Sequence, residues 1–162
     1  MIIGVISDTH IADITQKLPP KLIQGLKNTD LIIHAGDIVE LEILDQLKSV
    51  CPQIRAVAGN MDSEKTKEML PVKELITAGR FKIGVMHGWG PADGLPELLL
   101  EEFRNDKPDI IIFGHSHKPF NKKRKGVLLF NPGSVTDTVY APYNSYGILK
   151  VTDRIKSKIV KL

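Results

Sequence analysis

The sequence predicts an α/β (α+β) fold, with two β-sheets packed face to face and helices on the outside. Between residues 2 and 58, short β-branched runs alternate with segments of helical periodicity, which indicates parallel strands joined by right-handed crossovers. From about residue 71 the pattern changes to strands joined by short turns, which predicts a second, mostly antiparallel sheet. The apolar residues 110–113 indicate a strand covered on both faces, as in the middle of such a sandwich.

In the first half, three strands are expected, at residues 2–7, 31–33 and 54–58. A helix is expected to open at Pro19-Pro20 and to stop near Asn28, and an amphipathic helix covers residues 41–50. The crossovers place the carboxyl ends of all three strands at one edge of the sheet. Open α/β sheets bind their ligands at that edge.

The second half predicts six further strands and one helix. A hairpin turn is expected at Ala78-Gly79, a helix over residues 95–103 and another turn at residues 124–126. The strands are expected at residues 72–77, 80–86, 119–123, 127–130, 145–151 and 155–160, in addition to 110–113. Because no linker or repeat divides the chain, residues 1–162 are predicted to form a single domain.

Composition excludes several classes of protein. The single cysteine, Cys51, permits no intramolecular disulfide. No segment approaches the ~18 apolar residues of a membrane span, and the apolar N-terminal run lacks a basic leader, so we expect a cytoplasmic protein without a membrane partner. The formal net charge of +3 gives only mild attraction to anions. Nucleic acid, which needs a dense basic face, is not expected as a partner.

Polar side chains gather where the predicted strands end. They are Asp8, His10, Asp37, Asn60, His87, His115 and His117. Taken alone, the last two could equally be surface histidines after a core strand. Together, carboxylate, amide and imidazole groups suit borderline divalent ions better than Ca²⁺ or Mg²⁺, which prefer oxygen ligands. Seven groups are too many for one tetrahedral site, but they suit two ions that share a bridging carboxylate.

Five short motifs occur in an order that is known from one superfamily. They are Asp8-Thr9-His10, Gly36-Asp37, Gly59-Asn60-Met61-Asp62, His87-Gly88 and Gly114-His115-Ser116-His117. With the loop Asn131-Pro132-Gly133-Ser134, the chain resembles the calcineurin-like metallophosphoesterase superfamily, and within it the small bacterial and archaeal phosphodiesterase branch. The resemblance implies a four-layer αββα sandwich with two mixed β-sheets flanked by helices.

The resemblance also implies a division of the ligands between two ions. Asp8, His10, Asp37 and His117 would hold one ion, and Asp37, Asn60, His87 and His115 the other, so that Asp37 bridges. The implied ions are manganese first, with nickel, cobalt, iron or zinc as alternatives. Asp37, Asn60 and His87 would act in catalysis through the bound metals.

The implied activity is that of a hydrolase. A metal-bridging hydroxide would attack a phosphate ester, with a small phosphodiester as the expected substrate. The resemblance leaves a homodimer open as an assembly. Two other functions remain alternatives: a non-catalytic scaffold subunit, because the same fold serves in a eukaryotic membrane-trafficking coat, and a metal-dependent nuclease.

Position 61 departs from the pattern of many superfamily members. They carry a histidine directly after the asparagine ligand, whereas this chain has Met61, which cannot donate a proton. General acid catalysis typically contributes about 10²–10⁴-fold, so we expect slow turnover unless the ester has a good leaving group. Small members of the branch also tend to lack this histidine. The adjacent Asp62 is expected to orient solvent or neighbouring groups without being a ligand.

Other residues have a structural and a functional interpretation. His34 is expected to be packed or to support the ligands rather than to bind a third ion. The turn Lys122–Lys125 is expected to be solvated, with a phosphate-attracting rim as its functional alternative. Trp89 and Phe120 are expected to pack in the core or at the rim, with the pocket mouth as the alternative, and the loop 131–134 is expected to shape the site.

Overall fold

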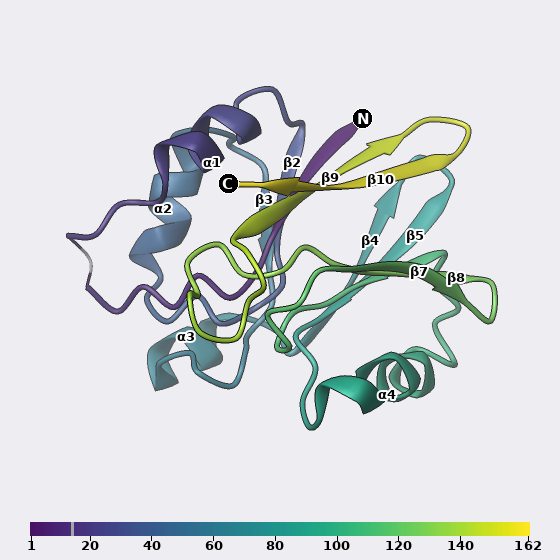
Figure 1. Cartoon of the computed structure of the whole chain (residues 1–162). Helices are drawn as coiled ribbons and strands as arrows, with labels where there is room; N and C mark the ends of the chain where they lie inside the picture. Colours follow the sequence, from purple (N-terminus) through teal and green to yellow (C-terminus); the bar gives the residue numbers. More distant parts are fainter. Residues whose placement is uncertain (14) are drawn as a thin grey trace.

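The computed structural model describes residues 1–13 and 15–162, and its strands form two five-stranded sheets (Figure 1). The first sheet has the order β10-β9-β1-β2-β3 and the second the order β4-β5-β6-β8-β7. The strands of the first sheet are β1 (Ile2–Ile6), β2 (Leu31–His34), β3 (Ile54–Ala56), β9 (Ser145–Val151) and β10 (Ile155–Lys161). Those of the second are β4 (Lys73–Ala78), β5 (Phe81–Met86), β6 (Ile110–Ile112), β7 (Phe120–Arg124) and β8 (Val127–Asn131).

Three helices lie on the outer faces of the two sheets (Figure 1). The first sheet is covered by α1 (Pro20–Leu26) and α2 (Glu42–Lys48), and the second by α4 (Leu95–Glu102), which follows the short 3₁₀ helix η1 (Ala92–Gly94). The remaining helix is α3 (Glu64–Met69). No helix in the described part of the chain is long and apolar enough to cross a membrane.

Three apolar clusters separate the layers. One lies between the sheets and joins residues such as Val5 and Ile33 to Val85 and Ile112. A second lies between the first sheet and α1 and α2, and a third between the second sheet and α4, where Phe103 packs. Helix, sheet, sheet and helix are therefore stacked in that order. The predicted αββα sandwich with two mixed sheets is confirmed.

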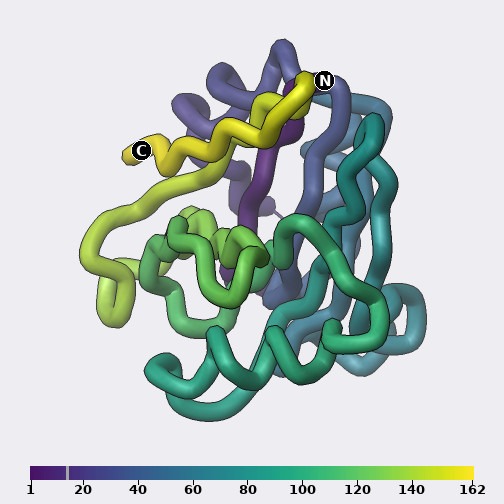
Figure 2. Tube along the Cα trace, turned by 90° about the vertical axis from the view of Figure 1, so that its right-hand side faces the viewer, coloured from purple at the N-terminus to yellow at the C-terminus, as the bar shows by residue number. Residues whose placement is uncertain are grey.

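The expectation of a mostly antiparallel second-half sheet is wrong. The last two strands, β9 and β10, join the first sheet, where β9 runs antiparallel to β1 (Figure 2). In the second sheet, β6 is parallel to both β5 and β8. Turn residues locate each hairpin correctly, but a turn carries no information about which sheet the hairpin joins.

One short helix was not expected from the sequence. Helix α3 has few apolar residues, and its signal is the N-cap Ser63, whose hydroxyl accepts a hydrogen bond from the Thr66 amide at 3.3 Å. The parallel arrangement of β1, β2 and β3, and of β5, β6 and β8, directs the carboxyl ends of six strands toward common loops. Those loops carry the predicted ligands.

Candidate metal centre

Each predicted ligand lies in a loop just after the carboxyl end of a strand. Asp8 and His10 follow β1, Asp37 follows β2, Asn60 follows β3, His87 follows β5, and His115 and His117 follow β6. Both sheets therefore contribute to one site. The arrangement follows from the parallel strands, which bring residues up to 109 positions apart to the same edge.

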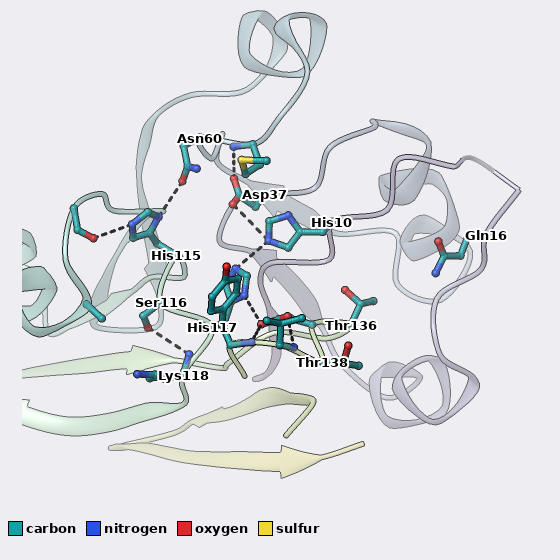
Figure 3. A pocket seen from close by; sticks show the side chains of 16 residues that line it. His10, Gln16, Asp37, Asn60, His115, Ser116, His117, Lys118, Thr136 and Thr138 are labelled. Carbon is teal, nitrogen blue, oxygen red and sulfur yellow. Dashed lines mark hydrogen bonds and ion pairs between the residues drawn. The ribbon is translucent and has the colours of Figure 1, made fainter. Parts of the chain in front are cut away.

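Four side chains form the first group of donors. One ligand atom from each of Asp8, His10, Asp37 and His117 lies within 4.8 Å of the others, a geometry that suits a metal ion. The Nε2 atoms of His10 and His117 are 3.0 Å apart (Figure 3). His117 Nε2 is also 3.3 Å from Asp8 Oδ1. His10 Nε2 also lies 3.6 Å from Asp37 Oδ2. These atoms share one small volume.

A second group of donors lies on the other side of Asp37. His115 Nδ1 is 2.9 Å from Asn60 Oδ1 (Figure 3). His87 Nε2 is 3.2 Å from Asp37 Oδ2. The rings of His87 and His115 meet edge to face, with their centroids 5.4 Å apart. The same carboxylate oxygen of Asp37 thus faces His10 in the first group and His87 in the second.

Hydrogen bonds on the far side of two histidines fix which nitrogen faces the site. A carbonyl oxygen only accepts, so His87 Nδ1 donates to Ala35 O at 2.7 Å and His115 Nε2 donates to Gly90 O at 3.0 Å. In the neutral rings this leaves lone pairs on His87 Nε2 and His115 Nδ1. Both of these nitrogens face the site, as ligand nitrogens must.

Two buried polar atoms at the site lack partners in the described part of the chain. They are Asp8 Oδ2 and His87 Nε2, on side chains that are 0% and 3% exposed. A buried oxygen or nitrogen without a hydrogen bond costs free energy, so such atoms call for an explanation. Divalent metal ions would satisfy both. The donor set of carboxylates, imidazoles and one amide fits such ions.

Electrostatics keeps the Asp37 carboxylate ionised. Burial acts to raise the pKa of Asp37, but the close contact with His87 and the charge of that ring outweigh burial and lower the pKa overall. The hydrogen bond to Asp8 is the main reason why the pKa of His117 rises to about 9, assisted by Asp137. The site therefore concentrates negative charge, which favours the protonated form of His117 and would also attract metal cations.

Five of the seven predicted ligands have left-handed backbone conformations. The φ angles are 53° at Asp8, 46° at His10, 55° at Asp37, 66° at His115 and 56° at His117. Non-glycine residues seldom adopt such angles, and they cluster at functional sites. The loops are shaped to bring these side chains inward.

Two glycines allow the loops to approach closely. A Cβ atom at Gly59 would lie 2.2 Å from Asp37 Oδ1, and one at Gly114 would lie 1.9 Å from the Ser7 hydroxyl and 2.7 Å from Asp8 Oδ2. Neither position has room for a side chain. The glycines in the Gly59-Asn60 and Gly114-His115 motifs are therefore required by packing around the carboxylates.

The two residues that follow Asn60 lie differently: Asp62 is buried between loops, and the side chain of Met61 faces the pocket. The Asp62 carboxylate is buried and accepts hydrogen bonds of 2.6 Å from the amides of Val39 and Gly59, so it joins two ligand loops and does not face the donors. The Met61 amide donates to Asp37 Oδ1 at 2.7 Å. Its side chain is 59% exposed and lines the pocket, at the position where many superfamily members carry a histidine.

The remaining candidates divide between packing and support. His34 is fully buried, with Nε2 3.2 Å from the Thr9 hydroxyl, which places it behind the ligand loop as expected. The turn Lys122–Lys125 is exposed and does not line the site pocket, whereas Lys118 does. Phe120 packs on Phe113 and Trp89 is 46% exposed; neither lines this pocket.

The loop after β8 supports the site through its side chains. Asn131 Nδ2 donates to Gly114 O at 2.7 Å, and the Ser134 hydroxyl donates to Asp8 O at 2.7 Å. Asp137, which sequence reasoning missed, accepts a hydrogen bond from His117 Nδ1 at 2.6 Å. No motif marks it, because its contact with His117 depends on a loop that returns to the site from 20 residues further along the chain.

Comparison with known proteins agrees with this site. The model of the calcineurin-like phosphoesterase superfamily domain matches residues 1–154. The chain belongs to this superfamily. A protein of Methanocaldococcus jannaschii described as a probable metallophosphoesterase is 40% identical, over 100% of this chain and 82% of its own length. The superfamily is therefore the one that the motifs predicted.

Two solved structures share the superfamily fold. The crystal structure of zinc-complexed Vps29 from Entamoeba histolytica has a TM-score of 0.77 and 27% identity, over 99% of each chain. The structure of an archaeal phosphodiesterase has a TM-score of 0.78 over 100% of each chain, and at 24% identity this likeness concerns the fold alone. The number of ions, their identity and the phosphodiester substrate stay predictions.

Proposed function

We propose that this protein is a dinuclear metal-dependent phosphodiesterase. The observation that carries the proposal is the place of Asp37. Its Oδ2 atom lies 3.6 Å from His10 Nε2 in one donor group and 3.2 Å from His87 Nε2 in the other. A carboxylate between two sets of donors is the arrangement that a bridging ligand needs.

The charges of the site favour an anionic substrate. Bound divalent ions would act as Lewis acids, hold phosphate oxygens and lower the pKa of a coordinated water. Asp8 and Asp37 neutralise only part of the charge of two such ions, and neutral histidines neutralise none of it. Lys118 at the pocket rim adds a cation. The pocket therefore attracts a phosphate ester and holds it by charge.

The pocket rim supports a diester rather than a monoester. The cavity has a volume of about 950 Å³, and its rim includes the exposed side chains of Met61, Val139 and Tyr140. These groups suit contact with an uncharged ester substituent. A diester carries one negative charge fewer than a monoester dianion, so it needs fewer cations around it. Lys118 is the one lysine or arginine among the described residues that line this cavity, which suits the less charged ester.

Manganese is the proposed ion. Each group offers two histidine nitrogens together with carboxylate or amide oxygens, a mixed shell that suits Mn, Fe, Co, Ni or Zn. Met61 cannot protonate a leaving group, so the proposed reaction depends on the ions and on the quality of the leaving group. A nitrophenyl ester meets this requirement, because nitrophenolate leaves without a proton.

The test measures metal content and hydrolysis together. Protein stripped with a chelator and reloaded with Mn²⁺ is expected to hold two ions per chain and to hydrolyse bis(4-nitrophenyl) phosphate faster than 4-nitrophenyl phosphate. Less than one ion per chain after loading, or no hydrolysis of either ester, would refute the proposal. A faster monoester reaction would refute the diester preference alone.

The similarity to Vps29 motivates one alternative, a binding subunit without catalysis. Asp37→Asn separates the two functions, because it keeps the shape of the bridging side chain but removes its charge. We expect the variant to lose at least 10²-fold in activity, as expected when a charged group at the reacting centre is removed. Unchanged hydrolysis in Asp37→Asn, with weakened binding of a protein partner, would favour the scaffold function.

A further inference from the structure

The loop that follows β8 contacts two of the ligand segments. The Ser134 hydroxyl donates to Asp8 O at 2.7 Å, and the Thr136 hydroxyl donates to Thr9 O at 2.7 Å. Three residues after Ser134, Asp137 reaches His117. One loop is thus bonded to the segment after β1 and to the segment after β6, which together supply three of the four donors in the first group.

The Asp137 carboxylate is held rigidly. Its Oδ1 accepts from the Val139 amide at 2.8 Å, and its Oδ2 accepts from the amides of Tyr140 and Ala141 at 2.9 and 2.8 Å. The side chain is only 10% exposed. Three backbone donors therefore hold the carboxylate in place independently of its contact with His117.

The contact determines the state of the His117 ring. Oδ2 of an ionised carboxylate only accepts, so the 2.6 Å contact requires the proton on His117 Nδ1. In the neutral ring, Nε2 then carries the lone pair. This nitrogen lies 3.3 Å from Asp8 Oδ1 and 3.0 Å from His10 Nε2, at the centre of the first donor group.

The second donor group is supported differently. There, His87 and His115 donate to the carbonyl oxygens of Ala35 and Gly90, which are neutral. A carboxylate on the far nitrogen raises the basicity of an imidazole ligand more than a carbonyl does, because it carries a full negative charge. The two proposed ion sites thus differ in the charge behind their histidines.

We propose that Asp137 is a positioning residue that selectively strengthens the ion site formed by Asp8, His10, Asp37 and His117. The inference rests on the proposed function, in that it assumes bound ions. It concerns affinity at one site and not the reaction itself. Asp137 acts through His117: it fixes the tautomer and the ring orientation, and its charge increases the electron donation from Nε2.

A merely structural role for Asp137 predicts a different result, and Asn144 offers the matched control. Asn144 Nδ2 donates to the backbone carbonyl of Asp137 at 2.7 Å, so it holds the same loop without contacting His117. Asn144→Ala loosens the loop alone. Asp137→Ala removes the loop contacts and the histidine contact, and Asp137→Asn keeps an acceptor for Nδ1 but removes the charge.

The experiment is a calorimetric titration of the chelator-treated proteins with Mn²⁺, with thermal melts to verify folding. We expect Asp137→Ala to weaken one of two binding events by about 10–100-fold and to leave the other within about threefold, with Asp137→Asn intermediate. Asn144→Ala should change neither event by more than threefold. NMR of the histidine rings in the Zn²⁺-loaded proteins, where the ion is diamagnetic, should show a strongly hydrogen-bonded Nδ1 proton on His117 in the wild type and the loss of that hydrogen bond in Asp137→Ala.

The outcomes separate the inference from the proposed function. Equal weakening of both events, or an equal effect of Asn144→Ala and Asp137→Ala, would overturn the inference and leave the dinuclear site intact. Unchanged binding in a folded Asp137→Asn and Asp137→Ala would do the same. Absence of any Mn²⁺ binding by the wild-type protein would overturn both. If Asp137→Ala does not fold, a full-affinity Asp137→Asn overturns the inference.

Discussion

Replacement of Asp62 by alanine tests whether the ligand loops are held by one buried carboxylate. Asp62 is 4% exposed and accepts hydrogen bonds of 2.6 Å from the amides of Val39 and Gly59. Val39 belongs to the loop that carries Asp37, and Gly59 precedes Asn60. The substitution therefore disconnects two segments that supply ligands and leaves two amides without partners.

The expected loss of stability follows from the two hydrogen bonds and from the backbone strain at Val39 that they stabilise. Hydrogen bonds to a charged group contribute about 1.5–3 kcal/mol each, so the pair contributes about 3–6 kcal/mol. Val39 has a φ of 76°, which is unfavourable for a β-branched residue, and its release returns about 1 kcal/mol or more. We expect Asp62→Ala to lower the free energy of unfolding by about 2–5 kcal/mol.

The assay is urea unfolding of the metal-free protein, followed by circular dichroism, for the wild type, Asp62→Ala and Asp62→Asn. Asparagine keeps one acceptor, so its loss should be smaller. Ser63→Ala is the matched control, because it removes only the cap of α3 and should cost about 1 kcal/mol. A loss for Asp62→Ala no larger than that for Ser63→Ala would refute the reasoning.

Three further predictions concern His34, Gly114 and the two histidines after β6. Burial lowers the pKa of His34 to about 3, so only the unfolded chain takes up the proton as the pH falls below 6.5. In urea unfolding, the wild type should lose about 2 kcal/mol of unfolding free energy, relative to His34→Gln, between pH 7.5 and pH 5. A difference between the two proteins that stays constant with pH would contradict this. Gly114→Ala places a Cβ atom 1.9 Å from a buried hydroxyl, so metal analysis should show that this variant loses ions. The control Gly94→Ala, whose Cβ atom would have nothing within 4 Å, should keep them. Full metal loading of both variants would contradict the prediction, because it would show that the neighbouring groups can move to make room. His115→Ala and His117→Ala should each lose a different ion in a metal titration, and loss of both ions in only one variant, or of none in either, would contradict the assignment.

The strands could be predicted because their signal is local. A run such as 110–112 is apolar throughout, and all three of its residues are buried in a central strand that pairs with β5 on one side and β8 on the other. The sheet membership of β9 and β10 could not be predicted, since the same hairpin could pack on either edge. Helix α3 was missed because its six residues bury only Thr66 and so lack an apolar period.

The ligand set could be predicted because strand ends in a parallel sheet lie together. Asp8 and His117 come from different sheets, yet both follow a parallel strand, and their side chains meet at 3.3 Å. Asp137 could not be predicted, because it follows β8 by six residues. It reaches His117 only because hydrogen bonds within its loop hold it there: the Asp137 amide donates to the Ser134 hydroxyl, and the Val139 amide donates to the Asp137 carboxylate. Support of this kind is visible only in three dimensions.

The left-handed ligands place backbone strain at the site, and the fold itself helps to hold it. Each such residue costs about 1–3 kcal/mol of backbone strain, and no local sequence signal predicts that a histidine or an aspartate will adopt this conformation. The strain persists because the loops bond to one another: the Asp8 amide donates to Gly36 O and the His10 amide to Asp37 O, each at 3.1 Å. These backbone bonds join segments almost 30 residues apart and involve no ion. Backbone hydrogen bonds of the fold therefore offset part of the strain in the ligand loops, and that part need not come from the binding free energy of a metal ion.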